Sequence, residues 1–297
     1  MNKEYRDVKS KISVCFSRSS FLYNIIRVPV RLLIWKLSKE HLKKNGQIYG
    51  PVFDYITTEI ILDGRFENNL LKCLEFFMLK EEQMDGRRNT CIDIGANIGN
   101  HSLFFSRLFK NVISFEPHPT NFKLLAMNVQ GRNVEIHNIA LSDADTSITL
   151  DVNDSFNSGA HRLANEELTE GIHIKAIRLD GFITDDQYID FMKIDVEGHE
   201  VKVLKGAVNT IKRCRPTIVF EQALEKIEYG SCETVALLKE MGYTNFYYLQ
   251  KRFYYDSMGP FLNIFRSLLV IIFGDRYTFV KLDYTPRRFH DMIIAKW

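Results

Sequence analysis

The first residues that could do chemistry lie in the segment Thr90–Asn100. A short apolar run there ends in the carboxylate of Asp93, and two glycines, Gly95 and Gly99, follow with three residues between them. Apolar positions on one side of His101–Phe109 indicate a helix, so the segment predicts a strand, a tight turn and a helix, as at the start of a Rossmann-like unit. We expect a ligand to lie against the bare backbone of this turn.

The composition of the turn indicates which ligand it suits. Position 97 is Asn, so the dinucleotide fingerprint G-x-G-x-x-G lacks its middle glycine, and no P-loop sequence is present. A carboxylate beside such a turn suits an ammonium group or hydroxyls better than phosphates. S-adenosylmethionine carries an ammonium, a ribose diol and a sulfonium, and no phosphate. From this motif alone, a strand, turn and helix without any ligand stays the alternative.

A second carboxylate, Glu116, ends the next predicted strand, which begins at Asn111 and is closed by Pro117. Glu116 lies 17 residues after Gly99. An acidic residue about 20 residues past a glycine turn, at the end of the second strand, is where a ribose diol is hydrogen-bonded. We therefore expect Glu116 to bind a ribose, the alternative being an ordinary surface glutamate.

The densest group of ionisable side chains, Asp195, Glu197 and His199, follows the apolar run Phe191–Ile194. If the backbone stays extended, the three point the same way. Two chemistries fit this group: a general base that takes a proton from a substrate hydroxyl, or a divalent metal held by carboxylates and imidazole. Histidine is the residue type that titrates near neutral pH, which favours His199 as the base. Alternatively, the two acids orient the turn or the cofactor.

Five sequence blocks occur together with the order and spacing of a known enzyme family. Any one of them is weak, because short motifs match by chance, but five in register are specific. The chain resembles the FkbM family of S-adenosylmethionine-dependent methyltransferases, closely over about residues 60–221. The blocks that carry the resemblance are Asp93–Gly99, Phe115–Pro119, Ala140–Asp143, Lys193–Glu200, and Val203–Gly206 with Arg215-Pro216 ahead of Glu221.

The resemblance implies an α/β fold, a Rossmann-like class I methyltransferase sheet with helices on both faces. It implies S-adenosylmethionine as cofactor and O-methylation of a hydroxyl on a sugar, glycan or other natural product, and it leaves N-methylation open. It places Asp143 beside the adenine, although Ser-Asp is also ordinary turn chemistry. The family motif is defined by Asp-x-Glu-Gly and varies at the position of His199, so His199 is not implied to be obligatory. The predicted cofactor-binding residues are Asp93, Gly95, Ala96, Asn97, Gly99, Glu116, Ser142 and Asp143.

The predicted substrate side comes from an insertion and from the end of the fifth core strand. Alternating patterns at 148–152 and 172–180 predict a hairpin within an insertion at about 146–180. Its polar loop, with Asn157, Ser158 and His161, is either a substrate lid or an ordinary hairpin loop. Glu221, after the strand Thr217–Phe220, is a further candidate for contact with the substrate.

Charge is unevenly distributed along the 297 residues, whose formal net charge is +2. Residues 1–46 hold eleven Lys and Arg against three acids, a net charge of +8, so the remainder carries −6. This basic charge is confined to the arm and is not interleaved with aromatic residues across the core, which argues against a nucleic-acid substrate. The five cysteines form no C-x-x-C, which indicates a reduced, cytoplasmic protein without a disulfide framework or zinc site.

The chain divides into an arm, 1–46, and a methyltransferase domain, 47–297, with a second insertion at about 251–285. Ser20–Lys44 has a helical pattern of apolar and basic residues, interrupted too often for a signal peptide and too short in its apolar run to span a bilayer. It is either a helix packed on the catalytic domain or a basic amphipathic helix at an anionic membrane. The apolar stretch 261–273 predicts a helical insertion before the last strand, packed on the arm or joining it at that membrane.

The remaining pattern predicts further elements of the same plan. These are a hairpin at 57–64, helices at Glu67–Lys80, at Asn121–Val129 with Thr120 as cap, at Glu200–Cys214 and from Ser231 to Met241, and strands at Asn245–Leu249 and His290–Trp297, the last one antiparallel. The sequence does not indicate an oligomeric state.

Two other protein classes remain open at this point. One is a dinucleotide-dependent oxidoreductase or epimerase, against which the missing middle glycine counts. The other is a non-catalytic module that binds S-adenosylmethionine without turnover. The intact set Asp93, Gly95, Gly99 and Glu116 argues against loss of the cofactor, but it does not address turnover.

Overall fold

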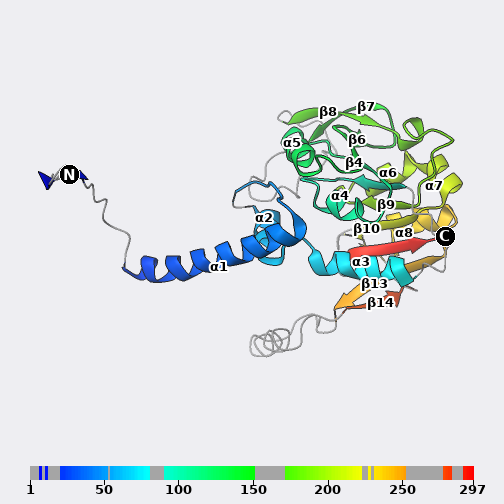
Figure 1. The fold of residues 1–297 in the computed structure, drawn as a ribbon. Coiled ribbons are helices and arrows are strands. Elements are labelled where there is room, and N and C mark those ends of the chain that lie inside the picture. The colour runs from blue at the N-terminus through cyan, green and yellow to red at the C-terminus, as the bar shows by residue number, and fades with distance from the viewer. Residues whose placement is uncertain are drawn as a thin grey trace.

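The computed structural model describes residues 7–8, 11–12, 21–52, 54–80, 90–150, 171–222, 227–228, 231–251, 277–282 and 290–297. Its centre is an eight-stranded sheet in the order β14-β13-β15-β10-β9-β3-β4-β5, shown in Figure 1. The Rossmann-like plan expected from the sequence is therefore confirmed. The strands are β3 (Thr90–Ile94), β4 (Asn111–Phe115), β5 (Val134–His137), β9 (Phe191–Ile194), β10 (Thr217–Gln222), β13 (Asn245–Lys251), β14 (Tyr277–Lys281) and β15 (His290–Lys296).

The strand directions create a switch point in the middle of the sheet. Strands β5, β4, β3, β9 and β10 are parallel, whereas β15 pairs antiparallel with both β10 and β13, as predicted for the last strand. The chain runs from β3 outward to β4 on one side and returns later to β9 on the other. Ligands in such sheets bind outside the carboxyl ends of the strands at this point.

Helices cover both faces of the sheet, as expected. On one face, α6 (Glu200–Lys205), α7 (Val208–Cys214) and α8 (Glu233–Glu240) pack on side chains such as Ile92 and Ile194. On the other face, α3 (Asn68–Lys80) and α4 (Asn100–Phe105) pack on Cys91, Phe191 and Val219, and α5 (Pro119–Asn128) packs on α4. Because side chains alternate along a strand, Asp93 and Lys193 share the face of α3 and α4.

The predicted hairpin at 57–64 is wrong: this stretch is helix α2 (Tyr55–Asp63). Asp54 caps its start, with Oδ2 accepting from the Thr57 N–H at 3.0 Å. Gly64, at φ 81°, ends it and donates its N–H to the Ile60 carbonyl at 2.9 Å. The two caps satisfy free backbone groups at both ends, and they override the strand preference of the β-branched residues between them.

Three other helix predictions need correction. Helix α5 begins at Pro119, and its cap is His118 rather than Thr120. The single helix predicted over 200–214 is two helices, α6 and α7; between them the backbone at Gly206 packs on the Ser142 carbonyl so closely that a Cβ would overlap it. Helix α8 begins at Glu233, with Cys232 rather than Ser231 at its cap position.

A small second sheet carries the insertion. Strand β7 (Thr146–Leu150) pairs antiparallel with β8 (Ile172–Ile177), which also pairs with β6 (Ala140–Leu141), and the turn η1 (Leu179–Gly181) leads back to the core. The two predicted strands of the insertion are therefore confirmed. The loop with Asn157, Ser158 and His161 lies outside the described residues, as does the apolar stretch 261–273. Two-residue strands form two further pairs, β1 (Asp7–Val8) with β2 (Lys11–Ile12) and β11 (Ile227–Glu228) with β12 (Ser231–Cys232).

The predicted arm helix is confirmed as α1 (Phe21–Asn45), which projects away from the body in Figure 1. Its C-terminal part is fastened to α2 by hydrogen bonds from His41 Nε2 to the Leu62 carbonyl and from Asn45 Nδ2 to the Gly64 carbonyl, each 3.0 Å long. Residues 27–36 are all exposed. Within the described part of the chain, α1 and the other helices are too short or too polar to cross a membrane.

Candidate active site

A cavity of about 190 Å³ opens at the carboxyl ends of the central parallel strands. Its floor is the turn after β3, and its sides come from the ends of β4, β9 and β10 and from the loop before α3. The predicted site residues among its lining are Gly95, Ala96, Asn97, Glu116, Asp195, Glu197 and Glu221; Glu67, His101 and Lys193 join them. The structure therefore brings four of the eight predicted cofactor-binding residues, two of the three predicted catalytic residues and the substrate candidate Glu221 to one place.

The turn after β3 has the conformation that its glycines allow. Gly95 and Asn97 adopt positive φ angles of 75° and 50°. A Cβ at Gly95 would overlap the carbonyl oxygen of Asp195, so only glycine lets this turn lie against the end of β9. Gly99, at φ 89°, begins α4 and contacts Leu125; it does not line the cavity. Gly99 therefore shapes the helix start instead of touching the ligand space.

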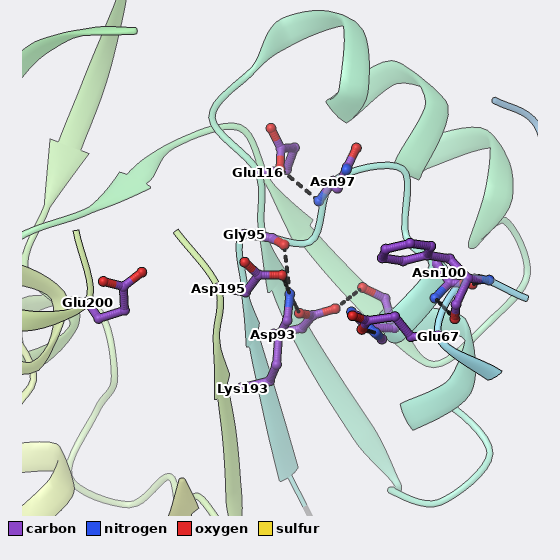
Figure 2. Close-up of polar contacts among 12 residues, drawn as sticks. Glu67, Asp93, Gly95, Asn97, Asn100, Glu116, Lys193, Asp195 and Glu200 are labelled. Carbon is purple, nitrogen blue, oxygen red and sulfur yellow. Dashed lines mark hydrogen bonds and ion pairs between the residues drawn. The ribbon is translucent and has the colours of Figure 1, made fainter. Parts of the chain in front are cut away.

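Glu116 joins the turns after β3 and β4, as Figure 2 shows. Its Oε2 accepts from the Asn97 N–H at 2.7 Å, and its Oε1 accepts from the His118 N–H at 2.8 Å. Burial raises the pKa of Glu116 to about 7, while the two backbone hydrogen bonds oppose that rise. Each carboxylate oxygen can accept a second hydrogen bond. A buried carboxylate in this position fits a ligand that donates two neighbouring hydroxyls.

Asp93 lies just behind the cavity lining, in an ion pair with Lys193. The Lys193 Nζ is 3.3 Å from Asp93 Oδ1 and 3.2 Å from Asp195 Oδ2, and it donates to the Gly95 carbonyl at 2.9 Å (Figure 2). Burial alone would lower the pKa of Lys193, but the charges of Asp195 and Asp93 outweigh it and hold the pKa above its ordinary value. The second Asp93 oxygen accepts from Ser102 Oγ at 2.6 Å. Lys193 thus fixes both the glycine turn and Asp195.

Sequence reasoning assigned no role to Lys193, Glu67 or His101. A lone lysine within the apolar strand Phe191–Ile194 was the available signal for Lys193. Glu67 and His101 meet at the cavity wall, with 3.1 Å between Nε2 of His101 and Oε2 of Glu67. His101 directly follows the glycine motif, but Glu67 lies 34 positions before His101, and their spacing carried no signal.

Carboxylates crowd the cavity at the ends of β9 and β10. Phe220 pairs with Ile194 across the two strands, so Glu221 lies beside Asp195. Burial raises the pKa of Glu221 to about 9, and the negative charges of Asp195 and Glu197 add to the rise. Smaller contributions come from the more distant Glu67 and Glu200. Such a group favours a cationic ligand, which would relieve the repulsion.

His199, the third residue of the predicted catalytic group, does not line the cavity. Strand β9 ends at Ile194, and the backbone turns through Glu197 (φ 49°) and Gly198 (φ 99°), so the extended arrangement that would align the three side chains does not occur. His199 is buried, and its Nε2 lies 2.9 Å from Ser142 Oγ. The same Ser142 hydroxyl is 3.1 Å from the carboxylate of the exposed Asp143.

Neither Ser142, Asp143 nor His199 lines the cavity, so their predicted contacts with adenine or acceptor stay predictions. Among the described residues, no three His, Cys, Asp or Glu side chains are placed to hold a metal ion together.

Residues 93–244 match the sequence model of the Methyltransferase FkbM domain, which is half of the chain. The chain belongs to the FkbM methyltransferase family. The resemblance expected from the sequence blocks is thereby confirmed. This assignment argues against the dinucleotide-dependent oxidoreductase or epimerase.

Two curated relatives and one solved structure are similar to parts of this chain. The hexuronic acid methyltransferase AglP of Haloferax volcanii is 31% identical over 165 residues, 54% of this chain and 64% of that protein. Methyltransferase 1 of Beauveria bassiana is 25% identical over 178 residues, 51% of this chain and 71% of that protein. An FkbM methyltransferase of Methylobacillus flagellatus is 15% identical, with a TM-score of 0.38 over 70% of this chain and 43% of its own.

Proposed function

We propose that this protein transfers a methyl group from S-adenosylmethionine to a hydroxyl oxygen of a sugar, glycan or other small natural product. The observation that carries the proposal is the junction of Glu116 with Asn97 at the edge of the cavity. It joins a glycine turn to a buried carboxylate at the switch point of the sheet, where a nucleoside is held in this architecture. N-methylation and binding without turnover are the alternatives.

The charges around the cavity support S-adenosylmethionine over a dinucleotide. Glu116 would accept from the ribose diol, and the turn Gly95–Asn97 would lie along the methionine part. Asp195 and Glu221 would face the positive charges of the ammonium and sulfonium groups. The lysine that lines the cavity, Lys193, is already held by two carboxylates. A pyrophosphate would meet net negative charge here.

S-adenosylmethionine supplies an electrophilic methyl group, which passes from sulfur to the acceptor oxygen as the carbon–sulfur bond breaks. The chain has to align the acceptor hydroxyl and take its proton. We assign the proton to Glu221, since the carboxylate of Asp195 is already paired with Lys193. A cation bound beside Glu221 would lower its raised pKa toward neutrality, where a general base works best.

Asp195 and Glu197 would then orient the acceptor or the cofactor ammonium. Alternatively, a divalent metal held by Asp195, Glu197 and His199 would orient the acceptor hydroxyl and make it more acidic. This arrangement is the less favoured one, because the backbone turn at Gly198 sends His199 toward Ser142. Adding EDTA or Mg²⁺ to an activity assay separates the two.

A sugar acceptor is supported by AglP, whose name assigns it hexuronic acid methylation. If the glycan were carried on a lipid, the acceptor hydroxyl would lie at a membrane surface, and the projecting helix α1 would hold the protein there. No nucleic-acid acceptor is proposed, because the basic charge lies on the arm and the cavity is acidic.

The proposal is tested by incubating the full chain with S-adenosylmethionine and a panel of acceptors. The panel would include a hexuronic acid glycoside, a neutral hexose glycoside, a phenol and a primary amine. We expect S-adenosylhomocysteine release and a mass gain of one methylene unit with a sugar hydroxyl. Methylation of the amine alone would contradict O-methylation. Binding of the cofactor without turnover on any acceptor would favour the non-catalytic module.

A further inference from the structure

Helix α1 exposes an apolar surface that the described part of the body does not cover. Leu32, Leu33 and Trp35 are 61%, 57% and 62% exposed, and Val28 and Ile34 are exposed as well. In Figure 1 this half of α1 stands away from the sheet and its helices, and α2 reaches only the C-terminal half. A contiguous apolar surface of this kind marks an interaction site.

Basic side chains lie beside this surface, and their number increases along α1 toward the body. Between residues 27 and 44 the helix carries six basic residues against one acid, Glu40, a net charge of +5. Arg27 and Arg31 lie one turn apart, on the same side of the helix. The other four basic residues occupy the half nearer the body; they are Lys36, Lys39, Lys43 and Lys44. We call this group the lysine collar.

Trp35 lies at the border between the apolar half and the lysine collar, and Lys39 Nζ is 5.0 Å from the centroid of its ring. Tryptophan favours the boundary between acyl chains and headgroups. Lysine and arginine extend their charged ends to the headgroups while their stems stay in apolar surroundings. The order along α1, apolar residues, then Trp35, then the collar, therefore matches the depth profile of one lipid leaflet.

We infer that residues 27–44 of α1 dock this protein on an anionic lipid surface. The apolar half enters the acyl boundary, Arg27 and Arg31 reach back to the headgroups, and the lysine collar lies along the anionic lipids. The helix would enter one leaflet with its apolar half foremost, and it is not long and apolar enough to cross the bilayer. The inference concerns the arm alone, and it would stand whatever the cavity binds.

A second copy of the chain fits this surface less well. Apolar side chains occupy the four consecutive positions 32–35, so they are spread around the helix axis instead of forming the single seam of a coiled coil. Two helices aligned in parallel would also bring their lysine collars together. An anionic bilayer, in contrast, covers a broad apolar surface and neutralises the charge at once.

Docking through α1 would bring the cavity near the lipid. His41 and Asn45, at the end of α1, hold the carbonyls of Leu62 and Gly64 at the end of α2. Helix α2 in turn contributes Tyr55 to the cavity lining. The segment that would contact the membrane is therefore fixed directly to one wall of the cavity.

The test is sedimentation of the full chain with vesicles of phosphatidylcholine alone or mixed with phosphatidylglycerol. We expect binding to the mixed vesicles, weakened by salt as surface charges are screened. Two variants should each reduce that binding by about tenfold or more. The apolar variant is L32Q/L33Q/W35Q and the collar variant is K36Q/K39Q/K43Q/K44Q. A matched control, which removes four exposed lysines of the body, is K72Q/K123Q/K175Q/K212Q.

The control should bind vesicles like the unchanged chain. All changed positions but one are exposed helix or loop sites, and Lys175 is exposed on β8, so circular dichroism should show folding unaltered. The inference is overturned if the unchanged chain does not bind the anionic vesicles, or if the control variant loses as much binding as the collar variant. It is also overturned if light scattering shows a dimer without lipid that the apolar variant turns into a monomer.

Discussion

Lys193 and Asp93 form a buried ion pair across two neighbouring strands, with Nζ 3.3 Å from Oδ1. The register places Asp93 on β3 directly beside Lys193 on β9, and the same ammonium reaches Asp195 and the Gly95 carbonyl. One lysine therefore ties the glycine turn to the strand end that carries the acidic residues. The geometry of the cavity depends on this contact.

Replacing Lys193 with Met should lower the free energy of unfolding by about 3–5 kcal/mol, because it leaves Asp93 buried without its partner. Urea unfolding of the variant measures the loss. Exposed Lys123→Met is the matched control and should change stability by less than about 0.5 kcal/mol. Adding Asp93→Asn to Lys193→Met should restore part of the loss; a double variant that loses the sum of both effects would show that the two residues do not act as a pair.

Replacing Glu116 with Gln should weaken binding of S-adenosylhomocysteine by about tenfold or more, because one carboxylate oxygen, which accepts hydrogen bonds, becomes an NH2 group, which only donates them. Calorimetric titration gives the dissociation constant. Glu240→Gln, at an exposed helix position, is the control and should bind like the unchanged chain. Equal affinity in both variants would remove Glu116 from the ligand site.

Glu221 should make the stability of the unliganded protein depend on pH. Its pKa is raised to about 9 in the folded chain from an ordinary value of 4.5, so the folded state holds the proton more tightly than the unfolded state. The contribution of Glu221 is then fully present below pH 4.5 and is lost as pH rises toward 9. In the variant Glu221→Gln, the side chain at this position cannot ionise.

Its stability relative to the unchanged chain should therefore increase between pH 5 and pH 9, as measured by urea unfolding at several pH values. Glu240→Gln should show no such trend. A constant difference between Glu221→Gln and the unchanged chain across that range would contradict the buried, crowded environment of this carboxyl.

Asp195→Asn should reduce turnover more than cofactor affinity. The side chain lines the cavity at the end of β9, and its pairing with Lys193 holds it in place for the reacting groups. Initial rates at saturating S-adenosylmethionine, compared with calorimetric affinity for S-adenosylhomocysteine, separate the two effects. Equal losses in rate and affinity would place Asp195 among the groups that hold the cofactor.

The sequence predicted the parts of the site that local patterns encode. The turn Gly95–Gly99 and the strand ends at Glu116 and Asp195 were identified because glycine spacing and apolar runs report the backbone directly. The hairpin at 57–64 failed because a β-branched run resembles a strand, and the capping by Asp54 and Gly64 outweighed it.

Contacts that depend on strand register could not be read in the same way. Lys193 and Asp93 are one hundred positions apart in the sequence, and the residues around each of them do not indicate that the two form a pair. The separation of His199 from Asp195 follows from the αL backbone at Glu197, which alternation along a strand does not foresee. Strand β14 was not predicted; it lies within the insertion expected at about 251–285, shortly after the apolar stretch 261–273 that suggested a helix.

The central claim is that the cavity between the Gly95 turn and Glu116 holds S-adenosylmethionine. Calorimetric titration of the full chain with S-adenosylhomocysteine tests it most directly, with NAD as the control ligand and with EDTA or Mg²⁺ added in turn. We predict binding of S-adenosylhomocysteine with a dissociation constant on the order of micromolar, no heat from NAD, and no change with EDTA. Binding of NAD, or of neither compound, would contradict the claim.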